Sequence, residues 1–351
     1  MSSLSVGIIQ SDFHAAHSTA WGPEWMRACA ERGVPHELID WRAGDAFTRM
    51  ARHAVVLWHF NHYSSDEMRF ARPILAALKA GGCKVFPDDG DADHFDDKVA
   101  QAYLLRSLGL PTPTNHVLHR RDAVEEWIKS VGRFPVVATL RSGSGASGVT
   151  LIASPDQLRR YASRMFGSGV RSRPSVALKI RSNLASARTL RDLTVRARRA
   201  PEFLFSWRKA SQLPREIGYV YLQEFIADCD HDIKVVVVGD RLSFICRAVR
   251  AGDFRASGGG SLFYDRSLVS QSLVRTAFDA AQALRSDCTG FDMIVDPRSG
   301  RPLILEVSYG FSHESLLRAG GHYDRSGAWH DVPLNAPQAV LDRMLLKADG
   351  G

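Results

Sequence analysis

The sequence of 351 residues lacks the signals of several protein classes. It has no uninterrupted apolar run of about 18 residues, the length that a membrane-spanning helix needs. Its first residues, MSSLSVGIIQSDFH, contain neither the basic segment nor the long apolar segment of a secretion signal. These absences predict a soluble, cytoplasmic protein without a membrane partner.

Metal-binding and redox patterns are also missing. The five cysteines are scattered along the chain and none forms a CxxC pair, and the thirteen histidines form no metal-binding pair with a nearby cysteine. This disfavours a disulfide framework and a zinc site. The chain has no Walker GK[ST] motif, no complete Rossmann fingerprint and no internal repeat. Most of the cysteines are therefore expected to be reduced and buried.

Basic residues are concentrated in one segment. Between Arg159 and Arg215 there are fifteen Lys and Arg against two acids, a local balance of +13 in a chain whose net charge is +7. Such a segment is either a solvated insert or a surface that binds an acidic acceptor, and the sequence leaves both open. A nucleic-acid-binding module built on this segment is the least favoured alternative, and its affinity would fall steeply with salt.

Hydrophobic periodicity divides the chain into four units and predicts a mixed α/β and α+β fold. Residues 1–95 alternate short apolar strands, such as SVGII and AVVLWHF, with amphipathic helices, which is typical of an open α/β domain. Residues 96–155 predict a helix, a strand and a hairpin with a glycine-rich tip. The basic insert covers 156–216. Residues 217–351 contain dense strand signals, one helix near 268–285 and a C-terminal tail.

Two acids in this last unit indicate a metal site. Asp292 lies inside FDMIVD and Glu306 ends PLILEV, and the turn PRSG between them predicts a hairpin. The hairpin would set both carboxylates side by side on one surface. Because Mg²⁺ usually binds one or two carboxylates together with substrate phosphates, the pair suits a nucleoside triphosphate. The alternative is a structural pair of acids partnered by arginines.

The glycine-rich run RSGSGASGV, residues 141–149, stands between two predicted strands. Glycines allow backbone N–H groups to approach oxyanions closely, and serines add donors, so this run is a candidate phosphate lid. An ordinary solvent loop is the alternative interpretation.

Five blocks in order resemble the ATP-grasp superfamily, and within it the branch that contains the ribosomal-protein glutamate ligases. The resemblance covers about residues 95 to 312. Each block alone is a weak identifier, but five in the right order are specific. The resemblance implies an ATP-grasp fold preceded by an open α/β domain. The blocks are DKVAQAYLLRSLGLPTP, FPVVATLRSGSGASGV, LQEFI with DIKVVVVGDRL, CRAVRAGDFRASGGG, and GFDMIV followed by ILEVS.

The resemblance implies residue roles position by position. It places adenine against the backbone of the segment from Gln223 to Ile226 and the ribose hydroxyls at Asp232. The full set implied for the nucleotide is Arg141, Ser144, Gly145, Gln223, Glu224, Phe225, Ile226, Asp232 and Lys234. The residues implied to face the phosphates, the acyl group or the acceptor are Arg247, Arg250 and Arg255, and those implied to bind the metal are Asp292, Glu306 and Ser308.

Two positions depart from the family pattern. The strand before the glycine-rich run normally ends in a lysine that reaches the phosphates, but Thr139 stands there; Arg141 or the basic insert would supply the charge instead. The third metal ligand is normally an asparagine, and here it is Ser308. A noncatalytic nucleotide-binding relative therefore stays open as an alternative.

The function implied is an ATP-dependent ligase that joins a carboxylate to an amine through an acyl phosphate and releases ADP and phosphate. The implied cofactors are ATP and two Mg²⁺ ions, with Mn²⁺ as a substitute. The carboxylate is a small molecule or a polymer, and the basic insert would contact an acidic acceptor. Outside the motifs, HFNHY at His59 to Tyr63 follows a predicted strand, where open α/β sheets bind ligands; a structural histidine pair is the alternative.

Overall fold

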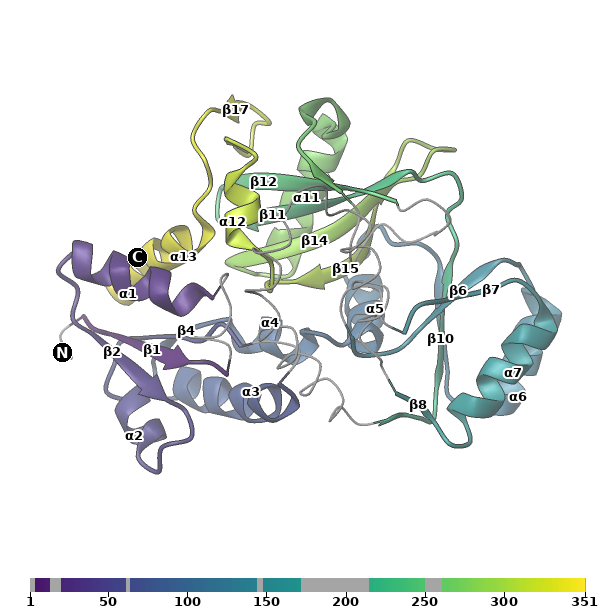
Figure 1. Cartoon of the computed structure of the whole chain (residues 1–351), viewed down its shortest axis with the longest axis horizontal. Coiled ribbons are helices and arrows are strands. Elements are labelled where there is room, and N and C mark those ends of the chain that lie inside the picture. Colours follow the sequence, from purple (N-terminus) through teal and green to yellow (C-terminus); the bar gives the residue numbers. More distant parts are fainter. Residues whose placement is uncertain are drawn as a thin grey trace, which may run out of the picture.

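The structure is a computed structural model that describes residues 4–12, 20–60, 64–143, 148–171, 215–249 and 261–350. These residues form three sheets and a two-stranded ribbon. In Figure 1 the N-terminal sheet lies at the lower left, a second sheet with its two helices lies at the right, and the C-terminal sheet lies above the centre. The mixed fold class predicted from the sequence is confirmed.

The N-terminal sheet is parallel and has the strand order β2-β1-β3-β4. Its strands are short apolar runs because helices cover the sheet, and Ile8 and Val56 are fully buried. The open α/β architecture predicted for this part of the chain is therefore present. Its elements are β1 (Val6–Gln10), α1 (Trp21–Glu31), β2 (His36–Asp40), α2 (Ala46–Met50), β3 (Val55–Leu57), α3 (Ser65–Ala80), β4 (Lys84–Phe86) and α4 (Asp89–His94).

The helix α5 (Lys98–Ser107) links the first sheet to the second. The Asp97 side chain caps its N-terminus by accepting a hydrogen bond from the Ala100 N–H at 2.9 Å. The helix ends just before Gly109, which has a positive φ of 64° that glycine adopts without strain. The helix that the sequence predicts at the start of 96–155 is therefore present.

The second sheet is antiparallel, with the order β5-β10-β6-β7. As predicted, β6 and β7 form a hairpin around the glycine-rich run, whose tip at 144–147 lies outside the described residues. The ribbon β8–β9 pairs 170–171 with 215–216 inside the predicted insert, and 172–214 between these two strands are not described. The elements are β5 (Asn115–Leu118), α6 (Arg121–Ser130), β6 (Val136–Thr139), β7 (Thr150–Ile152), α7 (Pro155–Met165), β8 (Val170–Arg171), β9 (Arg215–Glu216) and β10 (Val220–Glu224).

The third sheet is antiparallel, with the order β15-β14-β11-β12-β16-β17, and β13 pairs with β12. The strand β10 does not join it, although the sequence groups that strand with this unit, because β10 pairs with β5 and β6 of the second sheet. The elements are β11 (His231–Val238), β12 (Arg241–Ala248), β13 (Leu262–Phe263), η1 (Arg266–Leu268), α11 (Gln271–Ala283), β14 (Cys288–Val295), β15 (Pro302–Ser308), α12 (His313–Leu317), β16 (His322–Tyr323), β17 (Trp329–His330) and α13 (Ala336–Ala348).

The C-terminal helix α13 packs against α1 of the first domain (Figure 1). The indole N–H of Trp25 donates a hydrogen bond of 2.9 Å to the carbonyl of Pro337, and Trp25 shares one core with Ala336 and Val340 of α13. This contact ties the first domain to the end of the chain. Among the described helices, none is long and apolar enough to span a membrane.

Candidate nucleotide and metal site

A cavity of about 150 Å³ lies between the second and third sheets. One side comes from β6 and β10 and the other from β11, β14 and β15, so both sheets must be in place for the cavity to exist. The residues that line it are Lys98, Val137, Thr139, Val149, Tyr221, Gln223, Glu224, Phe225, Ile226, Cys229, His231, Asp232, Val249, Asp292, Ile294, Leu305 and Glu306.

One part of the cavity is apolar and edged by backbone. The strand β10 ends at Glu224, and the two residues that follow it, Phe225 and Ile226, line the cavity beyond the end of the sheet. Ile294 and Leu305 supply apolar surface from the third sheet. An apolar pocket next to backbone that lies outside the sheet is suited to a planar base. Such a base stacks on carbon atoms and forms hydrogen bonds with backbone groups at its edge.

The other part of the cavity is lined by the acids Asp232, Asp292 and Glu306, and cations on β11 and β12 contact two of these acids from outside the lining. Asp232 of β11 lies opposite Arg247 of β12, and Lys234 of β11 lies opposite Asp292 of β14. Asp292 in turn lies opposite Glu306 of β15. The hairpin predicted from the sequence therefore does set the two acids side by side.

Arg247 and Lys234 connect these acids. The Arg247 guanidinium donates to both carboxylate oxygens of Asp232, at 2.6 and 2.8 Å, and lies 3.0 Å from Asp292 Oδ2. The Lys234 ammonium lies 2.5 Å from Asp292 Oδ1. Asp232 is 3 % exposed and Asp292 is 9 % exposed. Two buried carboxylates are thus balanced by two cations on the same face of the sheet.

These contacts shift the pKa values of both acids. Burial acts to raise the pKa of Asp292, but the charges of Arg247 and Lys234 outweigh burial and hold that pKa well below its usual range. Burial raises the pKa of Asp232 to about 6 in spite of Arg247, with the charge of Asp292 acting in the same direction. Asp292 is therefore an anion across the physiological range, as a metal ligand must be.

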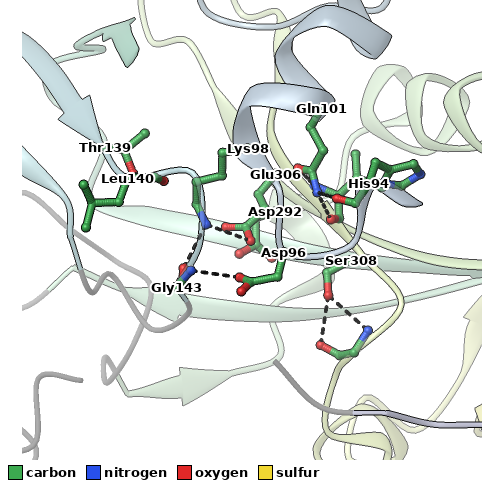
Figure 2. A network of polar contacts seen from close by, with 12 residues as sticks. His94, Asp96, Lys98, Gln101, Thr139, Leu140, Gly143, Asp292, Glu306 and Ser308 are labelled. Carbon is green, nitrogen blue, oxygen red and sulfur yellow. Dashed lines mark hydrogen bonds and ion pairs between the residues drawn. The ribbon is translucent and has the colours of Figure 1, made fainter. Parts of the chain in front are cut away.

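A further cation, Lys98 at the start of α5, reaches the same site. Its Nζ lies 3.3 Å from Glu306 Oε1 and donates a 2.8 Å hydrogen bond to the carbonyl of Gly143. Figure 2 shows the Lys98 ammonium between Gly143 and the carboxylates of Asp292 and Glu306. Burial acts to lower the pKa of Lys98, but Glu306 and Asp96 raise it above its ordinary value, so Lys98 stays charged.

Lys98 is the functional candidate that the sequence analysis misses. The buried Thr139 also lines the cavity, and its hydroxyl turns to the carbonyl of Leu140 at 3.4 Å. The position where a lysine is expected is therefore uncharged, and Lys98 supplies the positive charge from another element. The signal that could have revealed it is DDK at the start of the helix, where Lys98 directly follows a capping acid.

Gln101, one helical turn after Lys98, fixes the strand that carries Glu306. Its side-chain amide donates to the carbonyl of Val307 at 2.7 Å and accepts from the Val307 N–H at 3.0 Å. The same amide donates to the carbonyl of His94 at 2.9 Å. These bonds are buried and fix the position of β15, and therefore of Glu306, relative to α5.

The remaining predicted residues are placed differently. Arg141 is half exposed and pairs with Asp97 at 3.3 Å, and it does not line the cavity. The Ser308 hydroxyl bonds to both backbone groups of Gly310 and points away from Glu306 in Figure 2. His59 packs face to face with Trp21 in the core between the first domain and the end of the chain. The predicted residues outside the described part of the chain are 61–63 of the HFNHY segment, Ser144, Gly145, Arg250 and Arg255.

Asp292 and Glu306 fit a magnesium ion that takes its other ligands from phosphates and water. Among the described residues, no three His, Cys, Asp or Glu side chains lie together so as to hold a metal ion alone. Two carboxylates on adjacent strands, facing a cavity, are nevertheless the set that Mg²⁺ uses with a nucleotide. The donor atoms are oxygens only, which also suits Mg²⁺ or Mn²⁺ better than zinc.

Known proteins share sequence and fold with this chain. Residues 209–316 match the RimK-like ATP-grasp domain. This segment is therefore similar to that domain, and the chain has the ATP-grasp fold. It is 27 % identical over 232 residues to a tetrahydromethanopterin:α-L-glutamate ligase of Methanosarcina acetivorans. It is 24 % identical over 227 residues to a ribosomal protein bS6–L-glutamate ligase of Salmonella paratyphi B.

These alignments cover only part of each protein. They include 65 % and 64 % of this chain, and the chain spans 59 % of the length of each relative. A solved structure with a similar fold is a D-alanine–D-alanine ligase from Bacillus anthracis in complex with ATP. It has a TM-score of 0.57 and 13 % identity, and the match covers 99 % of this chain and 98 % of the other. The similarity extends through the N-terminal domain.

Proposed function

We propose that the protein is an ATP-dependent ligase that joins a carboxylate to an amine through an acyl phosphate. The observation that carries the proposal is the pairing of Asp292 with Glu306 at the charged end of a cavity whose other end is apolar and edged by backbone. The base would lie against residues 223–226, and the ribose hydroxyls would bind Asp232. The phosphates would then reach the charged end.

Each acid at that end has a cation beside it. Asp292 contacts Lys234 and Arg247, and Glu306 contacts Lys98. When bound by Asp292 and Glu306, one or two Mg²⁺ ions would neutralise charge on the phosphoryl group that is transferred. Because the metal ions would balance the charge of the two acids, Lys98, Lys234 and Arg247 could instead contact phosphate oxygens. Metal and nucleotide are therefore expected to bind cooperatively.

The reaction needs no side-chain nucleophile. An oxygen of the substrate carboxylate attacks the γ-phosphorus, the bond to the bridging oxygen breaks, and ADP leaves. The amine then adds to the acyl carbon and loses a proton, and the bond from that carbon to the phosphate oxygen breaks to release inorganic phosphate. Arg247 is positioned to balance negative charge in the first step, because its guanidinium already bridges two carboxylates of the site.

The substrates are proposed by chemical class. The names of two relatives contain L-glutamate as the group that is ligated, so glutamate is the first compound to test. The basic insert, with its fifteen Lys and Arg, would suit an acidic acceptor, either a small molecule or a polymer.

A noncatalytic nucleotide-binding protein is the second candidate. Two observations favour it: Thr139 has no charge, and the Ser308 hydroxyl is committed to Gly310. The presence of Lys98 at the site counts against it, because this lysine restores the missing charge. Turnover of ATP distinguishes the two candidates.

The experiment measures ATP binding by calorimetry with and without Mg²⁺, followed by ADP release in the presence of amino acids and acidic sugars. Binding that depends on Mg²⁺, and ADP release that needs one of the added compounds, would support the ligase. Asp292→Asn and Glu306→Gln should abolish the Mg²⁺ dependence, whereas Asp240→Asn, at an exposed turn of the same sheet, should not. Normal turnover in both site variants would refute the assignment.

A further inference from the structure

The residues that precede α5 are bonded to the start of the glycine-rich run. Asp96 Oδ1 accepts a hydrogen bond of 3.0 Å from the Gly143 N–H, and the Lys98 ammonium donates to the Gly143 carbonyl at 2.8 Å. The Lys98 N–H donates to the carbonyl of Arg141 at 2.8 Å. Both polar backbone groups of Gly143 are therefore held by one short segment that lies 45 to 47 residues earlier in the chain (Figure 2).

The burial and the backbone conformation of Asp96 are both energetically unfavourable for an aspartate. It is buried, and its φ is +53°, in the left-handed region that few residues other than glycine, asparagine and aspartate adopt. Its second oxygen, Oδ2, is buried and has no hydrogen-bond partner within the part of the chain that the structure describes. Burial raises the pKa of this carboxyl to about 7. Costly arrangements of this kind concentrate at functional sites.

We propose that Asp96 is a positioning residue that anchors Gly143, and with it the start of the glycine-rich run, at the phosphate end of the nucleotide site. The inference rests on the proposed function, because it assigns that end of the cavity to phosphates. Asp96 does not touch the nucleotide in this proposal. It acts through the backbone of Gly143, whose φ of +115° only glycine adopts readily.

Of the two side chains that bond to Gly143, Asp96 is the one expected to keep its bond, because Lys98 also contacts another partner. The Lys98 ammonium is shared between Gly143 and Glu306, at 2.8 and 3.3 Å. A phosphate group that draws Lys98 toward itself removes one of the two bonds on Gly143. The bond from the Gly143 N–H to Asp96 remains, so the backbone keeps its place while the lysine changes partner.

Three variants test the anchor. Asp96→Gly tolerates the positive φ but has no acceptor for the Gly143 N–H. Asp96→Asn also tolerates the positive φ, and its amide oxygen keeps the acceptor. Asp93→Asn is the control, because Asp93 is exposed and lies on α4 in the preceding turns. Each protein is titrated by calorimetry with the magnesium complex of the nonhydrolysable analogue AMP-PNP, and separately with adenosine, which lacks phosphates.

We expect Asp96→Gly to weaken binding of magnesium AMP-PNP by about tenfold, the loss that corresponds to one hydrogen bond. Adenosine binding should stay within about twofold, since the anchor acts at the phosphate end. Asp96→Asn should bind both ligands like the control. Equal weakening of both ligands, unchanged binding of magnesium AMP-PNP by Asp96→Gly, or equal loss in the Asn and Gly variants would each overturn the proposal.

Hydrogen exchange of the peptide that contains Gly143 gives a second test that needs no ligand. Its amide should exchange faster in Asp96→Gly than in the wild type, and at the wild-type rate in Asp93→Asn. Equal exchange in all three proteins would contradict the anchor. A wild-type protein that fails to bind magnesium AMP-PNP, yet shows the expected exchange, would refute the proposed function and leave the anchor standing.

Discussion

Replacing Lys98 with methionine tests whether this residue supplies the positive charge that Thr139 does not. Methionine keeps most of the volume of the side-chain stem and removes the ammonium, so packing at the start of α5 changes little. A hydrogen bond to a charged group contributes about 1.5–3 kcal/mol, and each 1.4 kcal/mol is about tenfold in affinity. Binding of MgATP should therefore weaken by roughly 10- to 150-fold.

The variant also removes the cation beside Glu306, and this sets the form of the assay. Glu306 is partly exposed, so its loss of a partner should affect folding little. Calorimetry with magnesium AMP-PNP should show the loss in affinity, whereas adenosine should bind as it does to the wild type. Lys129→Met, on the exposed face of α6, is the matched control. An affinity within twofold of the wild type would refute the role of Lys98.

Three further predictions follow from buried contacts. Gln101→Leu leaves the buried N–H and carbonyl of Val307 without the Gln101 amide and removes one of the two bonds to the His94 carbonyl, so chemical denaturation should show a loss of about 2 kcal/mol or more. Arg247→Lys cannot reproduce the two-pronged contact with Asp232, and MgATP should bind about tenfold more weakly in calorimetry. Burial raises the pKa of Glu67 from 4.5 to about 8. The folded state therefore keeps a proton that the unfolded state loses as the pH rises from about 4.5 to about 8. Over this range the free energy of unfolding of the wild type should fall relative to that of Glu67→Gln, and urea unfolding at a series of pH values measures the difference.

The parts of the fold that depend on neighbouring residues are predictable from the sequence. The hairpin of β14 and β15 needs only two apolar runs and a turn, and it sets Asp292 opposite Glu306 as expected. The hairpin of β6 and β7 and the helix α5 are local in the same way. In each case the periodicity of side chains and the turn residues contain the whole signal.

The contacts that complete the site are not local. Lys98 and Glu306 are separated by 208 residues, and Gln101 and Val307 by 206. Nothing in the spacing of a single sequence reports that α5 packs on β15. The same holds for β10, whose apolar pattern fits either neighbouring sheet, and for the docking of α13 on α1, where Trp25 and Pro337 are 312 residues apart. Tertiary packing decides these pairings.

The proposed ligase phosphorylates a carboxylate with ATP in this cavity, and an isotope experiment distinguishes this step from its alternatives. The carboxylate that stimulates ADP release is labelled with ¹⁸O in both oxygens, and the phosphate products are analysed by mass spectrometry after one round of ligation. An acyl phosphate predicts one ¹⁸O atom in inorganic phosphate, because the oxygen that attacks phosphorus leaves with it. Unlabelled phosphate would mean that water, not the carboxylate, attacks ATP. Label in AMP would mean that the intermediate is an acyl adenylate. Either result would refute the acyl phosphate.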